Sequence, residues 1–256
     1  MVYQPQYDRT GSCIIGYEAL IRWNSDIFGL ISPVEFIPIA EKNGAIYKIG
    51  QYVIGEVCEF MNQYAKVKGI LPTVSINVSF IELINPNFAV ELKNKVLGAN
   101  IPTHHIVIEI TETAISEFME IVLGNIRIIR ALGFEIHLDD FGTGYSSLNH
   151  LSKLTVDCVK IDKSFIDELL SNETTKTLVQ SIIELSHRIG MNVIAEGIEH
   201  IEQFQILSDF NCDGYQGYYF NKPLEKDKIL FSIDSLFDET IQNQEVSNET
   251  IKNSRY

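Results

Sequence analysis

The sequence predicts an α/β fold, a (β/α)8 TIM-like barrel in which one strand is antiparallel to the rest. Short β-rich runs alternate with longer stretches of helical period, as in parallel strands joined by helical crossovers. The strand candidates are nearly continuous apolar runs, which is typical of strands that are buried on both faces. The chain has 256 residues and no Pro- or Ser-rich linker, so a single closed barrel accounts for its length.

The first two strands depart from this alternation. Only residues 7–12 separate a strand around Gln4 from the apolar run Ile14–Trp23, a length that suits a hairpin turn and not a crossover. These two strands are therefore predicted to be antiparallel. The other strands are predicted at Thr73–Val78, Ile106–Thr111, Glu135–Leu138, Cys158–Ile161, Asn192–Ala195 and Tyr215–Phe220.

Helical period and end signals place the helices between these strands. Ser32 followed by Pro33 and Glu35 is typical of a helix start. Gly133 and Gly190 each follow a helical stretch and predict its end. The predicted helices are Pro33–Asn43, Ile46–Val67, Asn87–Leu97, Glu117–Ala131, Ser147–Leu151, Glu173–Ile189 and Ile201–Asp209.

The composition limits the partners and the location of the protein. A formal net charge of −14 excludes a binder of duplex nucleic acid, which would carry a basic face. No apolar run approaches the ~20 residues that span a bilayer, and no secretion signal is present. We therefore predict a soluble cytoplasmic protein without a membrane segment. The cysteines are widely spaced, which predicts reduced core thiols at Cys13, Cys58, Cys158 and Cys212.

Two adjacent carboxylates end one of the predicted strands. Asp139 and Asp140 close an apolar run, and a Gly-Thr-Gly segment follows them at residues 142–144. Like charges this close raise each other's pKa unless a cation neutralises them. A helix cap explains one such carboxylate, whereas two favour a divalent metal bound by oxygen ligands. His137, within the same run, is interpreted as a hydrogen-bonded core histidine.

Most of the predicted strands end in polar residues of a restricted kind. In a parallel barrel the carboxyl ends of the strands open on one face, where the active site lies. The barrel therefore gathers acidic, amide and lysine side chains into one mouth, a ligand set suited to one or two Mg²⁺ or Mn²⁺ ions. The residues gathered there are Glu18, Asn77, Glu109, Asp139, Asp140, Lys160, Glu196 and Gln216, and the same strand ends also carry Glu112, Asp162 and Glu199.

Taken alone, each of these residues has a simpler structural explanation. Glu18 or Glu109 is explained as a solvated charge, and Asn77 as a turn or cap residue. Lys160 and Asp162 are equally compatible with a structural ion pair. The joint pattern favours a site, because each charge interrupts an apolar run in which its burial is costly.

Several blocks of this sequence resemble the EAL-domain family of cyclic-di-GMP phosphodiesterases. Glu18-Ala-Leu20 is similar to the signature triplet of that family, and residues 139–148 are similar to its Asp-Asp loop. The likeness covers roughly residues 2–228, in order. The other matching blocks are Tyr3–Pro5, Glu35–Glu41, Asn77–Ser79, Glu109–Glu112, Lys160–Asp162, Glu196–Glu199 and Gln216–Gly217.

The resemblance implies a role for each residue that matches a family motif. The implied metal ligands are Glu18, Asn77, Glu109, Asp139, Asp140 and Glu196, and Asp139 would bridge two ions. The implied catalytic residues are Lys160, which holds the attacking water, Glu196, and Glu112, which tethers the loop after Asp140. The implied substrate contacts are Gln4, Leu20, Arg22 and Gln216.

The resemblance also predicts the extent of the domain and its assembly. Residues 1–237 are expected to form the EAL domain, with the N-terminal segment of the family domain short or missing, and residues 238–256 a polar, flexible tail. Thr155 stands where the family commonly has proline. A homodimer formed near the loop and helix after Asp140 is implied.

The expected function is the hydrolysis of cyclic-di-GMP to linear pGpG, with two Mg²⁺ or Mn²⁺ ions supporting in-line attack by an activated water. Two alternatives remain open at this point. One is a receptor that binds cyclic-di-GMP and does not cleave it. The other is an unrelated barrel enzyme, such as a metal-dependent aldolase. The complete set of strand-end ligands favours the hydrolase.

Overall fold

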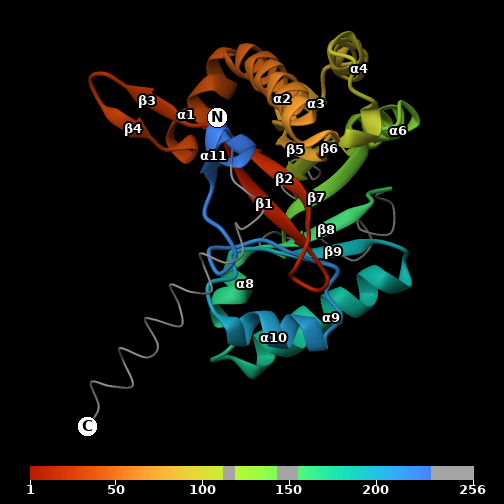
Figure 1. The fold of residues 1–256 in the computed structure, drawn as a ribbon. Coiled ribbons are helices and arrows are strands. Elements are labelled where there is room, and N and C mark those ends of the chain that lie inside the picture. The colour runs from red at the N-terminus through yellow and green to blue at the C-terminus, as the bar shows by residue number, and fades with distance from the viewer. Residues whose placement is uncertain (112–118, 143–154, 232–256) are drawn as a thin grey trace.

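The computed structural model describes residues 1–111, 119–142 and 155–231, and in this part of the chain eight strands close into a barrel (Figure 1). Neighbouring strands follow the order β10-β9-β8-β7-β6-β5-β2-β1, and the pairing of β1 with β10 closes the ring. The predicted TIM-like barrel is confirmed. Its strands are β1 Val2–Asp8, β2 Ile14–Leu20, β5 Val74–Asn77, β6 Ile106–Thr111, β7 Glu135–Phe141, β8 Cys158–Ile161, β9 Asn192–Ala195 and β10 Gly214–Tyr215.

One strand of the ring runs against the others. β1 pairs antiparallel with both β2 and β10, and with the short strand β11 (Leu224–Glu225), whereas β2 and β5 to β10 pair in parallel. Asp8 closes the turn from β1 to β2, because its Oδ1 accepts hydrogen bonds from the backbone N–H of Ser12 at 3.1 Å and of Cys13 at 3.2 Å. The predicted antiparallel pair is confirmed.

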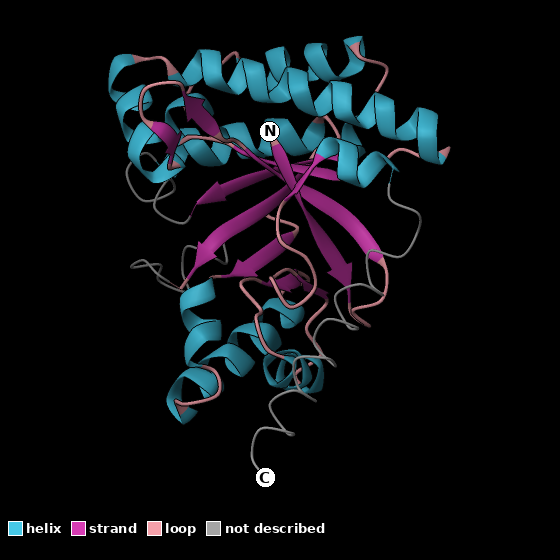
Figure 2. Cartoon of the chain, turned by 60° about the vertical axis from the view of Figure 1, so that its left-hand side comes forward, coloured by secondary structure: helices cyan, strands magenta, loops and turns pink. Residues whose placement is uncertain are grey.

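Helices cover the barrel on two sides. In Figure 1, α2, α3, α4 and α6 lie on one side of the strands and α8, α9 and α10 on the other, and Figure 2 shows the strands between these two groups. The helices are α1 Pro33–Asn43, α2 Ile46–Lys68, α3 Phe80–Leu83, α4 Phe88–Gly98, α6 Met119–Ala131, α8 Lys163–Glu168, α9 Glu173–Arg188, α10 Ile201–Asp209 and α11 Lys226–Phe231, with a short 3-10 turn η1 at Thr103–His105.

Among the described helices, none combines the length and the apolar character that crossing a membrane requires.

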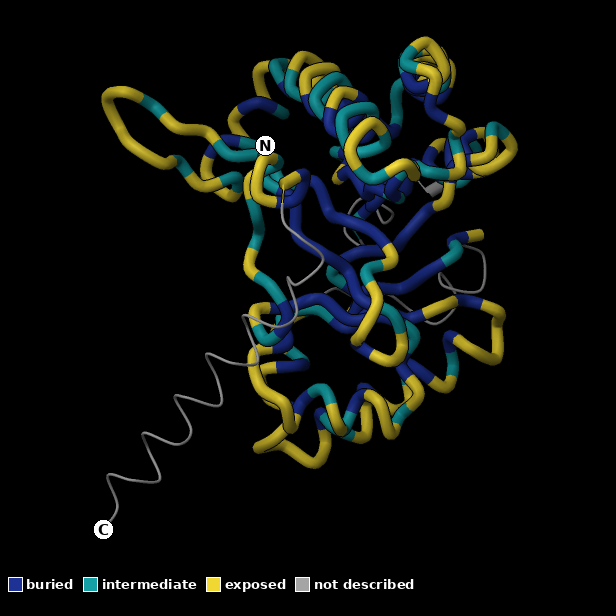
Figure 3. Tube along the Cα trace, viewed as in Figure 1, coloured by how far each residue is buried: buried dark blue, intermediate teal, exposed yellow. Residues whose placement is uncertain are grey.

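The core lies between the strands and the helices. On β7, Ile136 and Leu138 are fully buried and belong to the same hydrophobic cluster as Val122 and Ile126 of α6. A second cluster lies mainly between β8 to β10 and the helices α8 to α10. Figure 3 shows the strands as the most buried part of the molecule. Each fully buried aliphatic side chain stabilises this arrangement by roughly 1.5–3 kcal/mol, so the outer faces of the strands hold the barrel together.

The second predicted strand divides into two elements. β2 ends at Leu20, and Trp23 begins a separate hairpin of β3 (Trp23–Ser25) and β4 (Gly29–Ile31), which projects from the barrel in Figure 1. The predicted strand Ile14–Trp23 is therefore too long. The apolar residues of the sequence continue beyond the barrel strand into the hairpin. There Ile27 and other apolar side chains are exposed and do not belong to the core, so apolar character alone does not mark the end of β2.

The last predicted strand is also shorter than expected. β10 covers only Gly214–Tyr215, so the prediction of a strand over Tyr215–Phe220 is wrong beyond its first residue. The chain turns at Gly217, where a Cβ atom would lie 2.1 Å from the carbonyl oxygen of Ile198. The close approach of two backbone segments ends this strand, and a glycine is the one residue type that permits it.

The long helices agree with the predicted ranges to within two residues. The predicted helix Ser147–Leu151 and the predicted tail lie outside the described residues, and the short helices α3, α8 and α11 were not predicted. They contain only four to six residues, which is too short for a clear periodic signal. The expectation of core thiols holds for three cysteines and is wrong for Cys13, which is exposed in the turn between β1 and β2.

Candidate functional site

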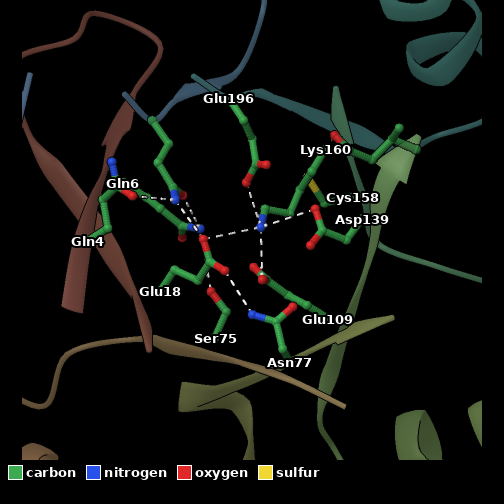
Figure 4. A network of polar contacts seen from close by, with 12 residues as sticks. Gln4, Gln6, Glu18, Ser75, Asn77, Glu109, Asp139, Cys158, Lys160 and Glu196 are labelled. Atoms are coloured by element: carbon green, nitrogen blue, oxygen red, sulfur yellow. Dashed lines mark hydrogen bonds and ion pairs between the residues drawn. The ribbon is translucent and has the colours of Figure 1, made fainter. Parts of the chain in front are cut away.

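A fully buried lysine lies at the centre of the barrel mouth. The Nζ atom of Lys160 is 2.6 Å from Glu196 Oε1, 2.8 Å from Glu109 Oε2, 3.4 Å from Asp139 Oδ1 and 3.5 Å from Glu18 Oε2 (Figure 4). Four carboxylates that are far apart in the sequence therefore surround one ammonium group. We call these five residues the acid cluster.

Strand register explains why the acid cluster forms. Its members stand near the carboxyl ends of β2, β6, β7 and β8, and Glu196 follows β9 directly. Asn77 on β5 pairs with Glu109 on β6, and Thr111 pairs with Asp139 on β7, so successive strands place their last residues side by side. The carboxyl ends of parallel barrel strands form one face, as predicted from the sequence.

The charges of the acid cluster are not balanced. Burial acts to lower the pKa of Lys160, but the four carboxylates raise that pKa well above its ordinary value, so the ammonium stays charged. Burial acts to raise the pKa of Glu18, and the charge of Lys160 with two amide hydrogen bonds lowers it below the ordinary value. Burial raises the pKa of Glu196 to about 8 and the pKa of Glu109 well above the ordinary value. One ammonium is thus not enough for four carboxylates.

A divalent cation fits this excess of negative charge. Oxygen atoms of Glu18, Glu109 and Asp139 all lie within 4.8 Å of one another. Glu109 Oε1 is buried and accepts no hydrogen bond from any described residue, and Asp139 Oδ1 has only its ion pair with Lys160 at 3.4 Å. Carboxylate oxygens are the ligands that Mg²⁺ and Mn²⁺ prefer, so the acids of this cluster suit such an ion.

Amide side chains complete one wall of the mouth. Asn77 Nδ2 donates to Glu18 Oε1 at 2.8 Å (Figure 4). Gln216 Nε2 donates to Glu18 Oε2 at 2.6 Å. Gln216 also contacts Gln4 Oε1 at 3.4 Å and accepts from Gln6 Nε2 at 3.0 Å. Gln6 was not predicted as a site residue. Its spacing of two from Gln4 on β1 places both side chains on the same face of that strand, which is the sequence signal for it.

Asp140 lies at the edge of the acid cluster in an unusual conformation. Its φ angle is 53°, which few residues other than glycine adopt, and the register of β7 with β8 shifts at this place. Burial and the neighbouring charge of Asp139 raise the pKa of Asp140 to about 6. The irregular backbone interrupts the alternation of a regular strand, in which two successive side chains would point to opposite faces.

A pocket of about 490 Å³ opens beside the acid cluster. Leu20 and Arg22, two of the predicted substrate contacts, line it together with Asn77. Arg22 Nη1 donates to the neighbouring carbonyl oxygen of Ile21 at 2.9 Å. Glu112, predicted as a catalytic residue, lies outside the described residues. The structure therefore places the other described residues that the family resemblance assigns to the site either in the mouth or in this adjoining pocket. The strand-end acid Glu199 does not join the acid cluster, because it is exposed and pairs with Lys163 at 2.9 Å.

Two structural alternatives from the sequence can be compared with these contacts. Lys160 pairs with the four carboxylates of the acid cluster. Asp162 instead caps α8 by accepting from the backbone N–H of Ser164 at 3.0 Å, so the prediction of a Lys160–Asp162 ion pair is wrong. His137 is buried, as predicted, and burial with the charge of Lys160 lowers its pKa to about 3. Its Nδ1 forms no hydrogen bond to a described residue, so the predicted hydrogen bond is not found on that nitrogen.

Barrel closure and the acid cluster at the carboxyl ends of its strands define a member of the TIM-like barrel proteins with a candidate metal centre. The family model of the EAL domain matches residues 1–223. This protein belongs to the EAL domain family.

Known relatives and solved structures agree with this assignment. The cyclic di-GMP phosphodiesterase PdeR of Escherichia coli (strain K12) is 34% identical over 222 residues, which are 87% of this chain and 33% of PdeR. The bifunctional diguanylate cyclase/cyclic di-GMP phosphodiesterase MucR of Pseudomonas aeruginosa is 32% identical over 231 residues, 90% of this chain and 34% of MucR. A structure titled "PaMucR Phosphodiesterase, c-di-GMP complex" matches with a TM-score of 0.84 and 31% identity, covering 89% of this chain and 92% of that one.

The chain spans about a third of the length of the curated relatives that it matches.

Proposed function

We propose that this chain hydrolyses cyclic-di-GMP to linear pGpG with the help of two Mg²⁺ or Mn²⁺ ions. The single observation that carries the proposal is the acid cluster, in which four carboxylates, three of them buried, share one ammonium group. The relatives named for cyclic-di-GMP hydrolysis support the choice of substrate. The chain carries a net negative charge, so a site that binds an anionic phosphodiester needs cations to offset the repulsion. The excess negative charge of the acid cluster would attract such cations.

The proposed ligands of the ions combine the acid cluster with its neighbours. Bound divalent ions would lower the pKa of a water molecule and offset negative charge on the phosphodiester. The oxygen atoms that would hold them belong to Glu18, Asn77, Glu109, Asp139, Asp140 and Glu196.

Lys160 and Glu196 are proposed to orient the attacking water and to accept its proton. Lys160 Nζ donates a hydrogen bond to the attacking water and keeps its charge next to four carboxylates. Glu196, 2.6 Å from that Nζ atom, would be ionised when bound cations offset the neighbouring acids, and it would then accept the proton of the water at a carboxylate oxygen. As the water attacks phosphorus, the bond from phosphorus to a ribose 3′-oxygen breaks. Glu112 is proposed to tether the loop after Asp140. Because Lys160 is fully buried, bulk water does not compete for this donor.

The remaining contacts concern the dinucleotide. Arg22 lines the pocket beside the acid cluster and is proposed to offset the charge of a phosphate. Gln4 and Gln216 form the amide wall on the other side of Glu18 and are proposed to contact the dinucleotide. Leu20 supplies an apolar surface in the pocket.

Timed chromatography of cyclic-di-GMP, incubated with the protein and Mn²⁺ or Mg²⁺, tests this proposal. We expect linear pGpG to accumulate, and we expect Glu18→Ala to lose about 4 kcal/mol of barrier reduction, or roughly 10³-fold in rate. Glu35→Ala is the matched control, because Glu35 is an exposed acid on α1 away from the acid cluster.

Two outcomes would contradict the proposal. Activity that survives Glu18→Ala with a divalent ion present excludes the acid cluster as the reactive centre. Recovery of intact cyclic-di-GMP from a protein that binds it identifies a receptor. The homodimer, the cytoplasmic location and the division into residues 1–237 and 238–256 stay predictions, and gel filtration with light scattering tests the first of them.

A further inference from the structure

Asn77 is the least enclosed of the strand-end residues proposed to bind metal. It is exposed at the end of β5, whereas Glu18, Glu109 and Asp139 are buried. Its Nδ2 donates to Glu18 Oε1 at 2.8 Å, which leaves Oδ1 as the atom available to a cation (Figure 4). Because the side chain of Asn77 is exposed, the position of Oδ1 depends on this bond and on the backbone on both sides of Asn77, which is paired with β6 on one side and enters a turn on the other.

That backbone is fixed two residues later, at Ser79. The side chain of Ser79 caps α3, because its Oγ accepts from the backbone N–H of Ile81 at 3.2 Å and the carboxylate of Glu82 accepts from the backbone N–H of Ser79 at 3.3 Å. The same Oγ donates to Glu41 Oε1 at 2.6 Å. The cap is therefore tied to a carboxylate that comes from another helix, α1.

Helix α2 holds the other side of this turn. A Cβ atom on Gly50 would lie 1.8 Å from Glu82 Oε1, so only glycine lets α2 approach the Glu82 carboxylate this closely. Tyr47, also on α2, donates from its hydroxyl to the carbonyl oxygen of Ile81 at 3.1 Å. We call Glu41, Ser79 and Glu82 the brace. The brace joins the end of β5 to both α1 and α2.

The brace and the proposed ligand face the same space. Asn77 and all three brace residues line the pocket of about 490 Å³ beside the acid cluster. The capping box by itself already completes the start of α3, so the additional bond from Ser79 to Glu41 is not needed to form that helix. A short charge-assisted bond at this position instead restricts the turn that carries Asn77.

We propose that Glu41 and Glu82 are positioning residues that act through Ser79 to direct Asn77 toward the metal. This inference rests on the proposed function, because that function assigns Asn77 as a ligand. Partners one step removed from a metal fix the orientation of its ligands, and their loss lowers metal affinity although every ligand remains. Removing the Glu41 carboxylate frees the Ser79 hydroxyl, and the turn then holds Asn77 Oδ1 less well.

Calorimetric titration of the metal-free full chain with Mn²⁺, with free Mn²⁺ followed by electron paramagnetic resonance, tests the inference without any turnover. We expect Glu41→Ala and Ser79→Ala to bind Mn²⁺ about tenfold more weakly. Glu41→Gln keeps an oxygen that accepts from Ser79, so its affinity should stay within about twofold. Glu35→Ala removes an exposed acid from the same helix and should change nothing.

A double-mutant cycle separates positioning from a general effect on the fold. If Glu41 acts through Asn77, Glu41→Ala should cause no further loss of Mn²⁺ affinity in an Asn77→Ala background. Additive losses would overturn the inference, as would unchanged affinity in folded Glu41→Ala or, if that variant does not fold, in Ser79→Ala. Failure of the unaltered chain to bind Mn²⁺ would overturn the proposed function as well, whereas normal binding and hydrolysis with an inert brace would overturn the inference alone.

Discussion

Buried and half-buried carboxyl groups gather at two neighbouring places in this protein, and they are neutralised in different ways. In the acid cluster, four carboxylates lie within 3.5 Å of the Lys160 ammonium. In the brace, Glu41 and Glu82 meet around the Ser79 hydroxyl, and the described contacts of Glu82 include no cation. The Lys160 ammonium offsets the charge of the acid cluster. In the brace, hydrogen bonds with Ser79 and a proton on Glu82 stabilise the carboxyl groups.

The two places differ in the acidity of their best-paired carboxyl groups, although burial also raises the pKa of Glu109 well above its ordinary value and the pKa of Glu196 to about 8. Burial acts to raise the pKa of Glu18, yet Lys160 and two amides lower it, and this carboxylate stays charged. Burial, aided by the charge of Glu41, raises the pKa of Glu82 to about 7, so this carboxyl group holds a proton well above its ordinary range. The charged carboxylate of Glu18 suits a metal ion. The proton that Glu82 holds below about pH 7 suits a structural role.

Among the changes considered, removal of the Lys160 charge should have the largest effect on stability and on the proposed hydrolysis. Lys160→Met keeps most of the side-chain volume and leaves four carboxylates, three of them buried, without an ammonium. We expect the free energy of unfolding of the metal-free protein to fall by about 3–5 kcal/mol, measured by urea denaturation in the presence of a chelator. The proposed hydrolysis should fall by roughly 10²–10⁴-fold, because the donor to the attacking water is lost.

Lys163→Met is the matched control for this change. Lys163 forms ion pairs with Asp167 at 2.6 Å and Glu199 at 2.9 Å, but these groups are exposed to solvent. Its replacement should change the free energy of unfolding by less than about 1 kcal/mol. Equal stability of Lys160→Met and the unaltered protein in chelator would show that the buried carboxylates do not depend on the ammonium.

The second prediction concerns the pH dependence of the brace. The pKa of Glu82 is raised from 4.5 to about 7 on folding, so the folded protein keeps a proton that the unfolded chain loses as pH rises through this range. The stability from this group is complete below about pH 4.5 and declines toward pH 7, by as much as ~3 kcal/mol. Glu82→Gln should remove this decline, as urea denaturation at several pH values would show.

An unchanged pH dependence in Glu82→Gln would mean that Glu82 is charged in the folded protein. Glu35→Gln again provides the control, since Glu35 is exposed and its loss should leave the pH profile of the unfolding free energy as it is.

The third and smallest effect is expected for Glu109→Gln. Burial and three neighbouring carboxylates raise the pKa of Glu109 well above its ordinary value, although Lys160 opposes this. Glutamine keeps an oxygen near Lys160 and removes one of the competing charges, so the metal-free protein should change in stability by only about 1 kcal/mol. Thermal unfolding should instead show a smaller gain from added Mn²⁺. An undiminished Mn²⁺ gain would exclude Glu109 from the metal site.

The acid cluster could be anticipated from the sequence because each of its members interrupts an apolar run near the end of a strand. Closure of the ring was then enough to predict that Glu18, Glu109 and Lys160 would meet. The antiparallel start followed from the short segment between β1 and β2, which cannot hold a crossover. Both predictions use only the direction and the order of strands.

The brace, the end of β10 and the hairpin of β3 and β4 could not be anticipated in the same way. Glu41 and Glu82 have ordinary positions in their helices, and only the contact of α1 with the cap of α3 joins them. The end of β10 depends on the distance between the backbones of Gly217 and Ile198. Distances of this kind between segments far apart in the chain leave no periodic mark in the sequence.

The direction of β1 has a consequence for how this barrel can be connected to other protein segments. Val2 pairs with Leu20, the last residue of β2, so β1 begins at the mouth of the barrel and runs toward its opposite end. A polypeptide segment that precedes Val2 would therefore reach the barrel at its mouth, close to Gln4, and not at the opposite end. A tether attached there can obstruct or clear the opening by its own movement, with no change inside the barrel.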